Sequence, residues 1–352
     1  MPNPMFDTLI IGQGLAGSAL AWQLIAAGQR VGVIDDGHRS SSSMVAAGLI
    51  NPLAGMRFNR RPELDDWLRA AHSWYAALEP LCGGPIYHPI PMLRLFRSAD
   101  QYRFHQRRRE DPHSQGLLGE RHAAGECREP VHAPYGSFVQ HQTGYVDLPR
   151  LLASIRAWLD EHNALITEPL DPASIEFGNG TVQAGDTSAG HLVFCDGAQL
   201  RFNPWFRHLP LAPDKGEILD LRCSSWKPRH IVNGAFWLLP GNDGVLRFGA
   251  THEHHALDLA TTGKARRTLI DGLHDMLPDA DCETIAQHAG IRPATSDRYP
   301  LLGRHPQHTR LWVCNGFGAR GALTVPWYTQ RLAAHLVQGR PLPAEADTGR
   351  FA

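Results

Sequence analysis

Apolar and polar residues near the start of the chain follow the pattern of a parallel βαβ unit. Apolar runs at 8–11 and 31–34 indicate two buried strands. Between them, Ala21 and Leu24 recur at helical spacing on one face, and Gly28 stands where such a helix would end. The first 35 residues are therefore predicted to form a strand, a helix and a second strand.

Helical and strand patterns continue to alternate further along the chain. Amphipathic spacing predicts helices over 65–81 and 150–161, and an apolar run predicts a buried strand over 191–198 that runs into a turn. The last segment returns to a strand at 310–314 and a helix at 322–337. This alternation is typical of an α/β domain.

The pattern changes between residues 209 and 252. Short apolar runs at 217–221, 235–239 and 245–250 are separated by turn residues, the clearest of which occupy 240–244. Such spacing is typical of an antiparallel sheet. We therefore expect a second domain that is inserted into the first.

The composition is that of a globular protein with about two domains. The chain has 352 residues, of which 43% are hydrophobic and 20% charged, with a formal net charge of -1. This balance predicts no nucleic-acid partner. The one concentrated basic run, 106–110, is interpreted as a solvated helix face in preference to a phosphate-binding patch. No apolar stretch is long enough to predict a membrane span.

The cysteines and the N-terminal segment bear on the cellular compartment. The chain has no Cys-x-x-Cys pair and no disulfide-framework spacing, which favours a reducing environment. The apolar N-terminal run has no basic segment before it, so it is not interpreted as a signal peptide. We expect a cytoplasmic protein whose cysteines are Cys82, Cys127, Cys195, Cys223, Cys282 and Cys314.

The first strand and helix are joined by a Gly-x-Gly-x-x-Gly turn. Gly12 permits a tight turn, Gly14 leaves room for a pyrophosphate, and Gly17 lets the helix pack on the sheet. The helix N-terminus offers N–H groups to the phosphates, and Asp35 can bind the ribose hydroxyls and would repel a 2′-phosphate. The pattern predicts a dinucleotide site that disfavours NADP and that contains Gly12, Gly14, Leu15, Ala16, Gly17, Asp35 and Asp36.

A second Gly-x-Gly-x-x-Gly turn, 316–321, also follows a predicted strand and precedes a predicted helix. We do not expect a second dinucleotide unit here, because no further strand and no acid follow at the required distance. A helix N-terminus favours negative charge, which a flavin acquires near its pyrimidine edge on reduction and a nicotinamide does not. The two turns are therefore expected to hold the two ends of one FAD molecule. An ordinary strand-to-helix turn is the alternative.

Small residues follow the N-terminal unit, with serines at 40–43 and then Met44-Val45-Ala46-Ala47-Gly48. Side chains this small let the backbone lie close to a flat group. A helix N-terminus capped by serine is an equally natural interpretation.

Taken together, these segments resemble the FAD-dependent oxidoreductases of the D-amino acid oxidase family, and within it the glycine oxidases. The matching segments span nearly the whole chain in the family's order, which is more specific than any single motif. They are the N-terminal glycine turn, 44–48, 144–147, 215–217, 248–251, 290–293, 300–306 and the C-terminal glycine turn.

The resemblance implies an α/β fold in which a Rossmann-type FAD-binding domain carries an inserted substrate domain built on an antiparallel sheet. The FAD-binding domain would comprise residues 1–82, 142–204 and 286–352. The substrate domain would comprise residues 83–141 and 205–285.

The resemblance also implies roles for individual residues. Ala46, Ala47 and Gly48 would lie along the flavin, and Arg292 would hold the substrate carboxylate. A guanidinium fork matches a carboxylate with two parallel hydrogen bonds, although a structural arginine at a strand end is the alternative. The other implied cofactor contacts are Gly197, Gly316, Phe317, Gly318, Ala319, Arg320 and Gly321.

The implied chemistry is oxidation of a C–N bond in a small amino acid or an N-substituted glycine. A substrate with a neutral amine passes hydride to the flavin, water hydrolyses the resulting imine, and oxygen or another acceptor reoxidises the flavin. The protein contributes orientation and electrostatics, so we assign no general base.

Two positions depart from the glycine oxidase pattern. The segment 236–240 lacks a substrate-binding tyrosine found there in glycine oxidases, and Trp237 is the expected pocket residue instead. Ala319 stands where those enzymes have an arginine, and Arg320 follows it, as in tRNA-modifying oxidases that cleave a carboxymethylamino group from a wobble uridine. Two alternatives therefore stay open, such a tRNA-modifying oxidase and an FAD-binding scaffold without turnover.

The histidines within 252–255 resemble a metal cluster, but they follow the predicted end of a strand. We interpret this segment as a solvated or substrate-proximal loop and expect no metal. Asp196 and Arg298 are interpreted as ordinary loop residues.

Overall fold

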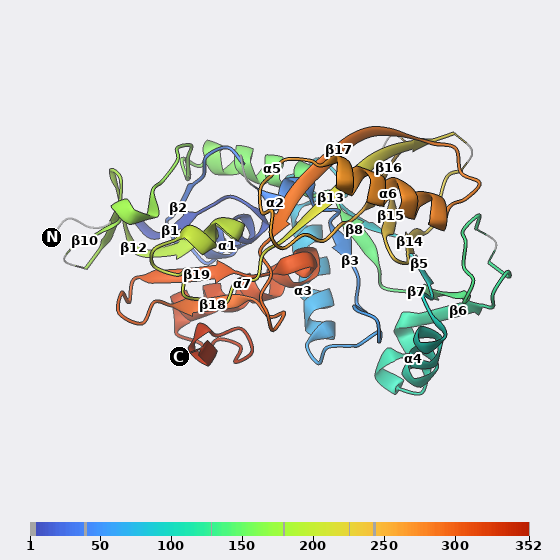
Figure 1. Ribbon diagram of the computed structural model, residues 1–352. Coiled ribbons are helices and arrows are strands. Elements are labelled where there is room, and N and C mark those ends of the chain that lie inside the picture. Colours follow the sequence, from blue (N-terminus) through green and yellow to red (C-terminus); the bar gives the residue numbers. More distant parts are fainter. Residues whose placement is uncertain are drawn as a thin grey trace.

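The computed structural model describes residues 5–38, 41–127, 129–178, 180–224, 226–241 and 244–351. Two eight-stranded sheets with packed helices make up most of the molecule (Figure 1). One sheet has a parallel centre and the other is almost entirely antiparallel, which confirms the predicted α/β class. Asn242 and Asp243, which belong to a predicted turn, and Ser40, the first of the four consecutive serines, lie outside the described residues.

The first sheet is built around β1. This strand pairs in parallel with β2 and β12, and the parallel part continues to β9 on one side and β19 on the other. Antiparallel strands β18, β11 and β10 extend its margins. The strands are β1 (Phe6–Ile11), β2 (Val31–Ile34), β9 (Leu165–Ile166), β10 (Glu176–Phe177), β11 (Val182–Ala184), β12 (Thr187–Phe194), β18 (Leu301–Arg304) and β19 (Leu311–Asn315).

Successive side chains of β1 pack into two different apolar layers. Ile10 packs with a layer of helices on one face of the sheet, whereas Leu9 and Ile11 pack on the other face. Because both faces are buried, these strands are almost continuously apolar. The helices of the first layer are α1 (Leu15–Ala26), α3 (Leu64–Leu78), α5 (Leu148–Glu161) and α7 (Gly321–Gln338).

Two of these helices have bounds that differ from the predicted ones. The helix predicted over 65–81 ends at Leu78. Glu79 keeps helical backbone angles as the C-cap, and Pro80 has no N–H group with which to continue the hydrogen bonds of the helix. The helix predicted from residue 150 begins at Leu148, because the Asp147 side chain caps it by accepting a hydrogen bond from the Arg150 N–H.

The second sheet has the order β17-β13-β16-β15-β14-β5-β7-β6 and is antiparallel except between β14 and β5. Helix α6 (Gly263–Met276) covers one face, where Leu269 packs with Leu219 and Phe248. The opposite face borders a cavity. The strands are β5 (Met92–Leu95), β6 (Leu118–His122), β7 (Ser137–Gln140), β13 (Asp214–Cys223), β14 (Ile231–Asn233), β15 (Trp237–Pro240), β16 (Val245–Gly249) and β17 (Cys282–Arg292).

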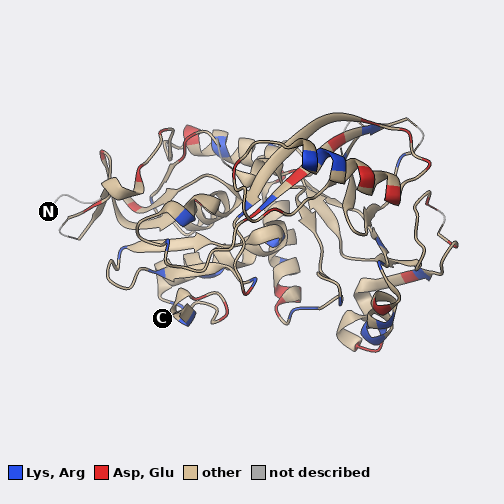
Figure 2. Ribbon diagram, viewed as in Figure 1, with Lys and Arg blue, Asp and Glu red and all other residues tan. Residues whose placement is uncertain are grey.

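The remaining elements include a small third sheet and a peripheral helix. A third sheet has the order β3-β8-β4, and helix α4 carries the basic run, whose Arg107 and Arg109 are exposed as predicted (Figure 2). No helix among the described residues has both the length and the apolar character of a membrane span. The remaining elements are α2 (Ser42–Val45), β3 (Leu49–Ile50), β4 (Tyr87–Pro89), α4 (Ala99–Arg109), β8 (Gly144–Val146) and short 3₁₀ helices at Pro112–Leu117, Pro172–Ser174, Gly197–Phe202, Gly318–Arg320 and Thr348–Phe351.

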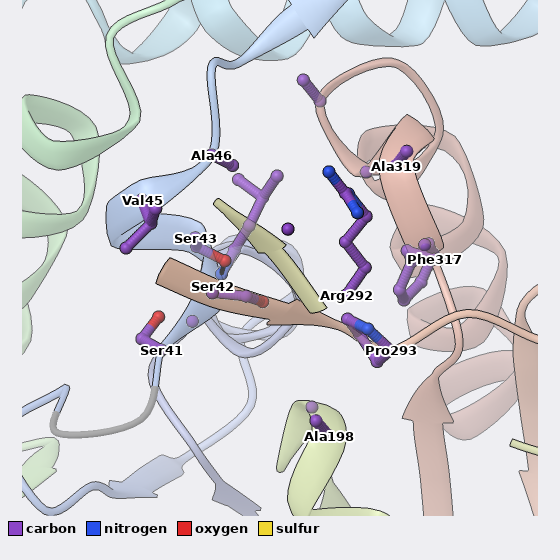
Figure 3. A pocket seen from close by; sticks show the side chains of 18 of the residues that line it. Ser41, Ser42, Ser43, Val45, Ala46, Ala198, Arg292, Pro293, Phe317 and Ala319 are labelled. Carbon is purple, nitrogen blue, oxygen red and sulfur yellow. Dashed lines mark hydrogen bonds between the residues drawn. The ribbon is translucent and has the colours of Figure 1, made fainter. Parts of the chain in front are cut away.

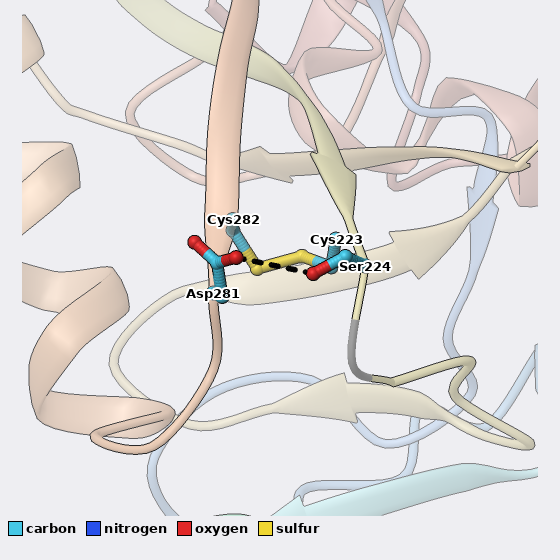
Figure 4. The surroundings of a disulfide bond; sticks show 4 residues. All are labelled: Cys223, Ser224, Asp281 and Cys282. Carbon is cyan, nitrogen blue, oxygen red and sulfur yellow. Dashed lines mark hydrogen bonds between the residues drawn. A yellow bond between two sulfur atoms is a disulfide. The ribbon is translucent and has the colours of Figure 1, made fainter.

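The cysteine spacing gave no sign of a disulfide, but the structure contains one. Cys223 and Cys282 form a disulfide, with their Cα atoms 4.1 Å apart (Figure 4). The two residues are 59 positions apart in the chain but directly opposite in the register of β13 and β17. The spacing of the two cysteines in the sequence does not predict this disulfide, because they become neighbours only when β13 and β17 pair in this register.

Candidate functional site

A cavity of about 890 Å³ lies between the first and second sheets. Its walls include the N-terminal glycine turn within 12–16, helix α2 with the following residues 46–48, and the C-terminal turn at 317–321. Its floor is the open face of the second sheet, with Ile218 and Trp237. Segments from both ends of the chain therefore meet around one space (Figure 3).

The N-terminal turn has room for a ligand but not for larger side chains. Gly12 has φ +98°, and a Cβ there would lie 2.7 Å from the Cys195 carbonyl oxygen. Gly17 does not line the cavity; a Cβ on it would overlap the Gly12 carbonyl oxygen where α1 packs on β1. Gly14 is the N-cap of α1 and has no side chain to cap it, so the positive end of the helix faces the cavity.

Asp35 places a fixed negative charge at this end of the cavity. Its Oδ2 accepts a hydrogen bond from the Gln13 N–H at 2.9 Å, and its Oδ1 accepts from Gly37 N–H at 2.9 Å and Arg156 Nη1 at 2.8 Å. Burial raises the pKa of Asp35, but the hydrogen bonds and the nearby positive charge outweigh burial and hold the pKa below its ordinary value. Asp36 also lines the cavity.

The small-residue segment forms a short helix, whose N-cap Ser41 makes no capping hydrogen bond, and then runs along the cavity. Residues 42–45 form the short helix α2, and Ala46, Ala47 and Gly48 then line the cavity. Gly48 has φ +65°, and a Cβ on it would overlap the Val146 carbonyl oxygen. Ser41 faces the cavity, and its buried hydroxyl has no hydrogen-bond partner among the described residues (Figure 3).

The C-terminal turn faces the cavity from the opposite side. Gly316 has φ +80° and makes the turn without lining the cavity, whereas Phe317, Gly318, Ala319, Arg320 and Gly321 line it. The Arg320 guanidinium lies 4.9 Å from the centre of the Trp67 ring, and its Nε and Nη2 have no hydrogen-bond partner among the described residues. Burial, together with the charge of Arg61, lowers the pKa of Arg320 to about 10. At neutral pH this arginine is therefore still a cation.

Asp196 is not the ordinary loop residue expected from the sequence. It lines the cavity next to Gly197 and accepts hydrogen bonds from Asn203 Nδ2 at 3.0 Å and Asn315 Nδ2 at 2.9 Å. Burial raises its pKa to about 6 despite these bonds. Asp196 therefore joins the end of β12 to the C-terminal turn. Arg298, by contrast, is an exposed loop residue as expected.

Arg292 lies at the end of β17 and reaches into the cavity (Figure 3). Its Nη1 donates to Asp214 Oδ2 at 2.8 Å and to the Thr251 carbonyl oxygen at 3.3 Å. The same Asp214 oxygen lies 2.7 Å from His252 Nδ1. Burial raises the pKa of Asp214, but His252 and Arg292 outweigh burial and hold it below its ordinary value. The carboxylate thus fixes one edge of the guanidinium.

His252, from the segment interpreted as a solvated or substrate-proximal loop, also lines the cavity. Among the described residues, no group of three or more histidine, cysteine or acidic side chains is arranged to hold a metal ion. Trp237 lies in the sheet floor opposite Gly249, where a Cβ would come within 3.0 Å of the indole. The glycine makes room for the Trp237 ring under the cavity.

The family model for FAD-dependent oxidoreductases of the DAO type matches residues 7–336. The chain belongs to this family. Glycine oxidase of Pseudomonas aeruginosa is 26% identical to this oxidoreductase, and the match covers 94% of each chain. A bifunctional protein of tRNA 5-methylaminomethyl-2-thiouridine biosynthesis from Aromatoleum aromaticum is 27% identical, and there the match covers 96% of this chain and 58% of that protein.

Solved structures share the fold of this oxidoreductase. Glycine oxidase from Geobacillus kaustophilus superposes with a TM-score of 0.83 at 22% identity, and the match covers 99% of this chain and 98% of that one. Iminodiacetate oxidase from Chelativorans sp. BNC1 superposes with a TM-score of 0.79 at 25% identity over 96% of each chain. The resemblance inferred from the sequence is confirmed, and the cofactor of the oxidoreductase is FAD.

The cavity of this oxidoreductase fits FAD. One end offers a helix N-terminus, the unpartnered Ser41 hydroxyl and the Asp35 carboxylate, which suit a pyrophosphate and a ribose. The other end offers the start of α7 beyond the C-terminal turn, and Gly14 and Gly318 present bare backbone to the cavity. FAD, when bound, supplies the hydride acceptor.

Sequence reasoning missed two residues of the site. Arg156 on α5 bonds Asp35 without lining the cavity, and Arg94 lines the cavity from β5. Arg156 gives no local signal, because only the fold brings it to Asp35. Arg94 had a signal: it is a charged residue in the middle of the apolar run 92–96, at a position where an inward-facing side chain is expected.

Proposed function

We propose that this oxidoreductase oxidises the C–N bond of a small amino acid or an N-substituted glycine, and that Arg292 binds the substrate carboxylate. The observation that carries the proposal is the Arg292 guanidinium in the cavity, oriented by Asp214. Its glycine oxidase and iminodiacetate oxidase relatives support this substrate class. Oxygen or another electron acceptor would complete the turnover.

The residues around Arg292 support a role in binding and orientation. Nη1 of Arg292 donates to Asp214 and to the Thr251 carbonyl oxygen, and Nη2 also donates to that oxygen at 3.4 Å. The Nε–H and one Nη2 N–H are left for a carboxylate. A substrate held in this way has its amine-bearing carbon fixed above the floor, near Trp237. Fixed orientation of this kind can supply a large part of a rate enhancement.

We also propose the domain organisation that the resemblance implies. Residues 1–82, 142–204 and 286–352 would bind FAD, with the adenosine end at Gly12–Asp36 and the flavin end at 46–48, 197 and 316–321. Residues 83–141 and 205–285 would shape the substrate side. Strand β17 runs continuously across the proposed boundary at 285/286, which ties Arg292 to the antiparallel sheet.

Anaerobic mixing with candidate substrates tests the proposal. Purified holoenzyme is mixed with glycine, sarcosine, and D- and L-amino acids, and we expect one class to bleach the visible flavin absorption. Arg292→Ala should lower kcat/KM at least about 100-fold, mainly through KM, because bonds between charged partners are worth roughly 1.5–3 kcal/mol each. Arg298→Ala, an exposed neighbour, is the matched control and should stay within about twofold. Equal kinetics for the two variants would contradict the role of Arg292.

A tRNA-modifying oxidase is the second candidate. The relative from tRNA 5-methylaminomethyl-2-thiouridine biosynthesis supports it, together with Arg320 in the C-terminal turn. Mass analysis of tRNA nucleosides from a deletion strain tests it, and an unchanged nucleoside profile would exclude it. If no small amine bleaches the flavin and the tRNA profile is unchanged, a scaffold without turnover becomes the better proposal.

A further inference from the structure

We propose that the cavity contains a second anion-binding subsite at Arg94, and that the preferred substrate is an amino acid with a second carboxylate on a flexible arm. This inference rests on the proposed function, since it adds a substrate class to the same cavity. It is carried by the burial, the hydrogen-bond partners and the position of Arg94.

Arg94 is a buried cation with only neutral partners. The residue is 6% exposed, and its Nη1 donates to the Leu53 carbonyl oxygen at 2.8 Å, Gln140 Oε1 at 3.1 Å and Asn51 Oδ1 at 3.4 Å. Its guanidinium carbon lies 5.0 Å from the centre of the Phe58 ring. Among the described residues, no aspartate or glutamate bonds to it.

Such burial is costly unless an anion compensates for it. A charged group that leaves water loses solvation energy, which neutral acceptors recover only in part. Burial lowers the pKa of Arg94 to about 10, so the guanidinium stays protonated at neutral pH. Nη1 donates all of these hydrogen bonds, and Nε and Nη2 have no partner among the described residues. The side chain therefore has N–H groups left for a carboxylate.

Arg94 faces the same cavity as the proposed substrate site. It lines the cavity together with Asn51 and Asn233, and strand register places Asn233 directly beside Arg94. Trp237 is in turn opposite Asn233. Arg94 thus lies two strands from Trp237, roughly 10 Å across the sheet floor. A substrate arm that extends past the indole ring would reach it.

Arg94 and Arg292 lie toward opposite sides of the floor. Arg292 is on β17 and Arg94 is on β5, and four strands separate them in the sheet order. With about 4.8 Å between neighbouring strands, the two backbones are on the order of 24 Å apart, a span that two long arginine side chains shorten. A substrate that engages both cations therefore carries its second carboxylate several bonds from the first, with apolar Ile218 and Trp237 beneath the arm.

The test uses pairs of substrates that differ only in charge. N-(ω-carboxyalkyl)glycines with one to five methylene groups are compared with their ω-carboxamides, and kcat/KM is measured for each with the holoenzyme. We expect the acid to be preferred over the amide at least 10-fold at one arm length. Arg94→Met should reduce that ratio to near one, and Arg94→Lys should keep part of it. Arg103→Met, at an exposed arginine on α4, should keep the full ratio.

A ratio near one for every arm length in the unmodified enzyme would overturn the subsite. The same conclusion follows if Arg94→Met keeps its flavin and also keeps the ratio. If Arg94→Met does not fold, diacid binding is compared between the Arg94→Lys variant and the unmodified enzyme. The α,ω-diacids from glutarate to suberate should perturb the flavin spectrum of both proteins. Their affinity should be weaker in Arg94→Lys. This measurement needs no turnover, so it separates failure of the subsite from failure of the proposed function. Equal diacid affinities would count against Arg94.

Discussion

Among single residues, certain glycines around the cavity stand where any side chain would collide with the neighbouring backbone. Gly17 and Gly48 are packed so closely against backbone carbonyl oxygens that a methyl group would overlap them. Gly28 and Gly37, by comparison, have open space around them and serve only their turns. These glycines therefore differ in purpose: Gly17 and Gly48 let a neighbouring segment of the chain pack closely, whereas Gly28 and Gly37 allow a positive φ.

Asp196 makes stability depend on pH in the direction opposite to most carboxylates. Its folded pKa of about 6 lies above its ordinary value of 3.8, so the folded protein binds the proton more tightly than the unfolded chain does. The contribution of Asp196 to the free energy of unfolding should therefore be most favourable below about pH 4. It should decrease as the pH rises through about 6, by at most about 3 kcal/mol in total.

Thermal melts of the unmodified protein and of Asp196→Asn between pH 4 and 8 test this expectation. The asparagine variant should lose the part of the pH dependence that lies between pH 4 and 6. It cannot accept hydrogen bonds from both Asn203 and Asn315, but that loss is the same at every pH. Melting curves that shift in parallel for the two proteins would show that Asp196 does not titrate as described.

At the scale of elements, buried polar groups join helix α6 to the second sheet. Glu217 on β13 is 3% exposed and accepts hydrogen bonds from the Thr262 N–H and hydroxyl, both at 2.9 Å, and from Gln287 Nε2 at 2.6 Å. Thr262 is also the N-cap of α6, because its Oγ1 accepts from the Ala265 N–H at 3.1 Å. The Thr262 hydroxyl thus caps helix α6 and also donates a hydrogen bond to the buried Glu217 carboxylate.

Thr262→Ala should lower the free energy of unfolding by about 1–3 kcal/mol, since both the cap and a bond to a buried carboxylate are lost. Denaturant unfolding followed by circular dichroism measures this, and the flavin spectrum of the folded variant should be unchanged. Thr268→Ala on the same helix is the control, because its hydroxyl bonds only the Lys264 carbonyl oxygen within the helix. Similar losses for both variants would contradict the role given to Thr262.

Across the whole molecule, a covalent bond between residues far apart in the chain reinforces the antiparallel sheet. The Cys223–Cys282 disulfide joins β13 to β17 at the end remote from Arg292, which pairs with Asp214 at the other end of the same strands. The disulfide encloses the whole hairpin region that contains β14, β15, β16 and α6. It therefore links the strand that carries Arg292 to the rest of the floor.

Non-reducing peptide mapping should recover Cys223 and Cys282 in one linked peptide, while Cys82, Cys127, Cys195 and Cys314 are alkylated. In the chain-entropy description, loss of a loop of this length costs up to about 4 kcal/mol, so Cys223→Ser with Cys282→Ser should unfold at lower denaturant concentration. Cys127→Ser, at a free and half-buried thiol, serves as the control. Alkylation of all six cysteines in protein purified without reductant would contradict the pairing.

Local patterns explain why much of the fold could be predicted. The strand, glycine turn, helix and acid at 8–35 are encoded within one short segment, where steric freedom at glycine and apolar periodicity act between near neighbours. The same holds for the C-terminal turn and α7, and for the change to antiparallel strands after residue 209. The order of the motifs along the chain then indicated the family, and with it FAD.

Other features depend on which distant segments the fold brings together. The Asp35–Arg156 ion pair, the Asp196–Asn315 bond and the disulfide each join residues that are far apart in sequence and carry no local signal. Arg94 could be noticed as a charge in an apolar run, but its lack of an acidic partner is a property of the packed cavity. The sequence alone determined the elements, the cofactor and the family, because these follow from local periodicity and ordered motifs. Only the tertiary structure decided the surroundings of each charge, because burial and partner distance exist only once the two sheets have packed around the cavity.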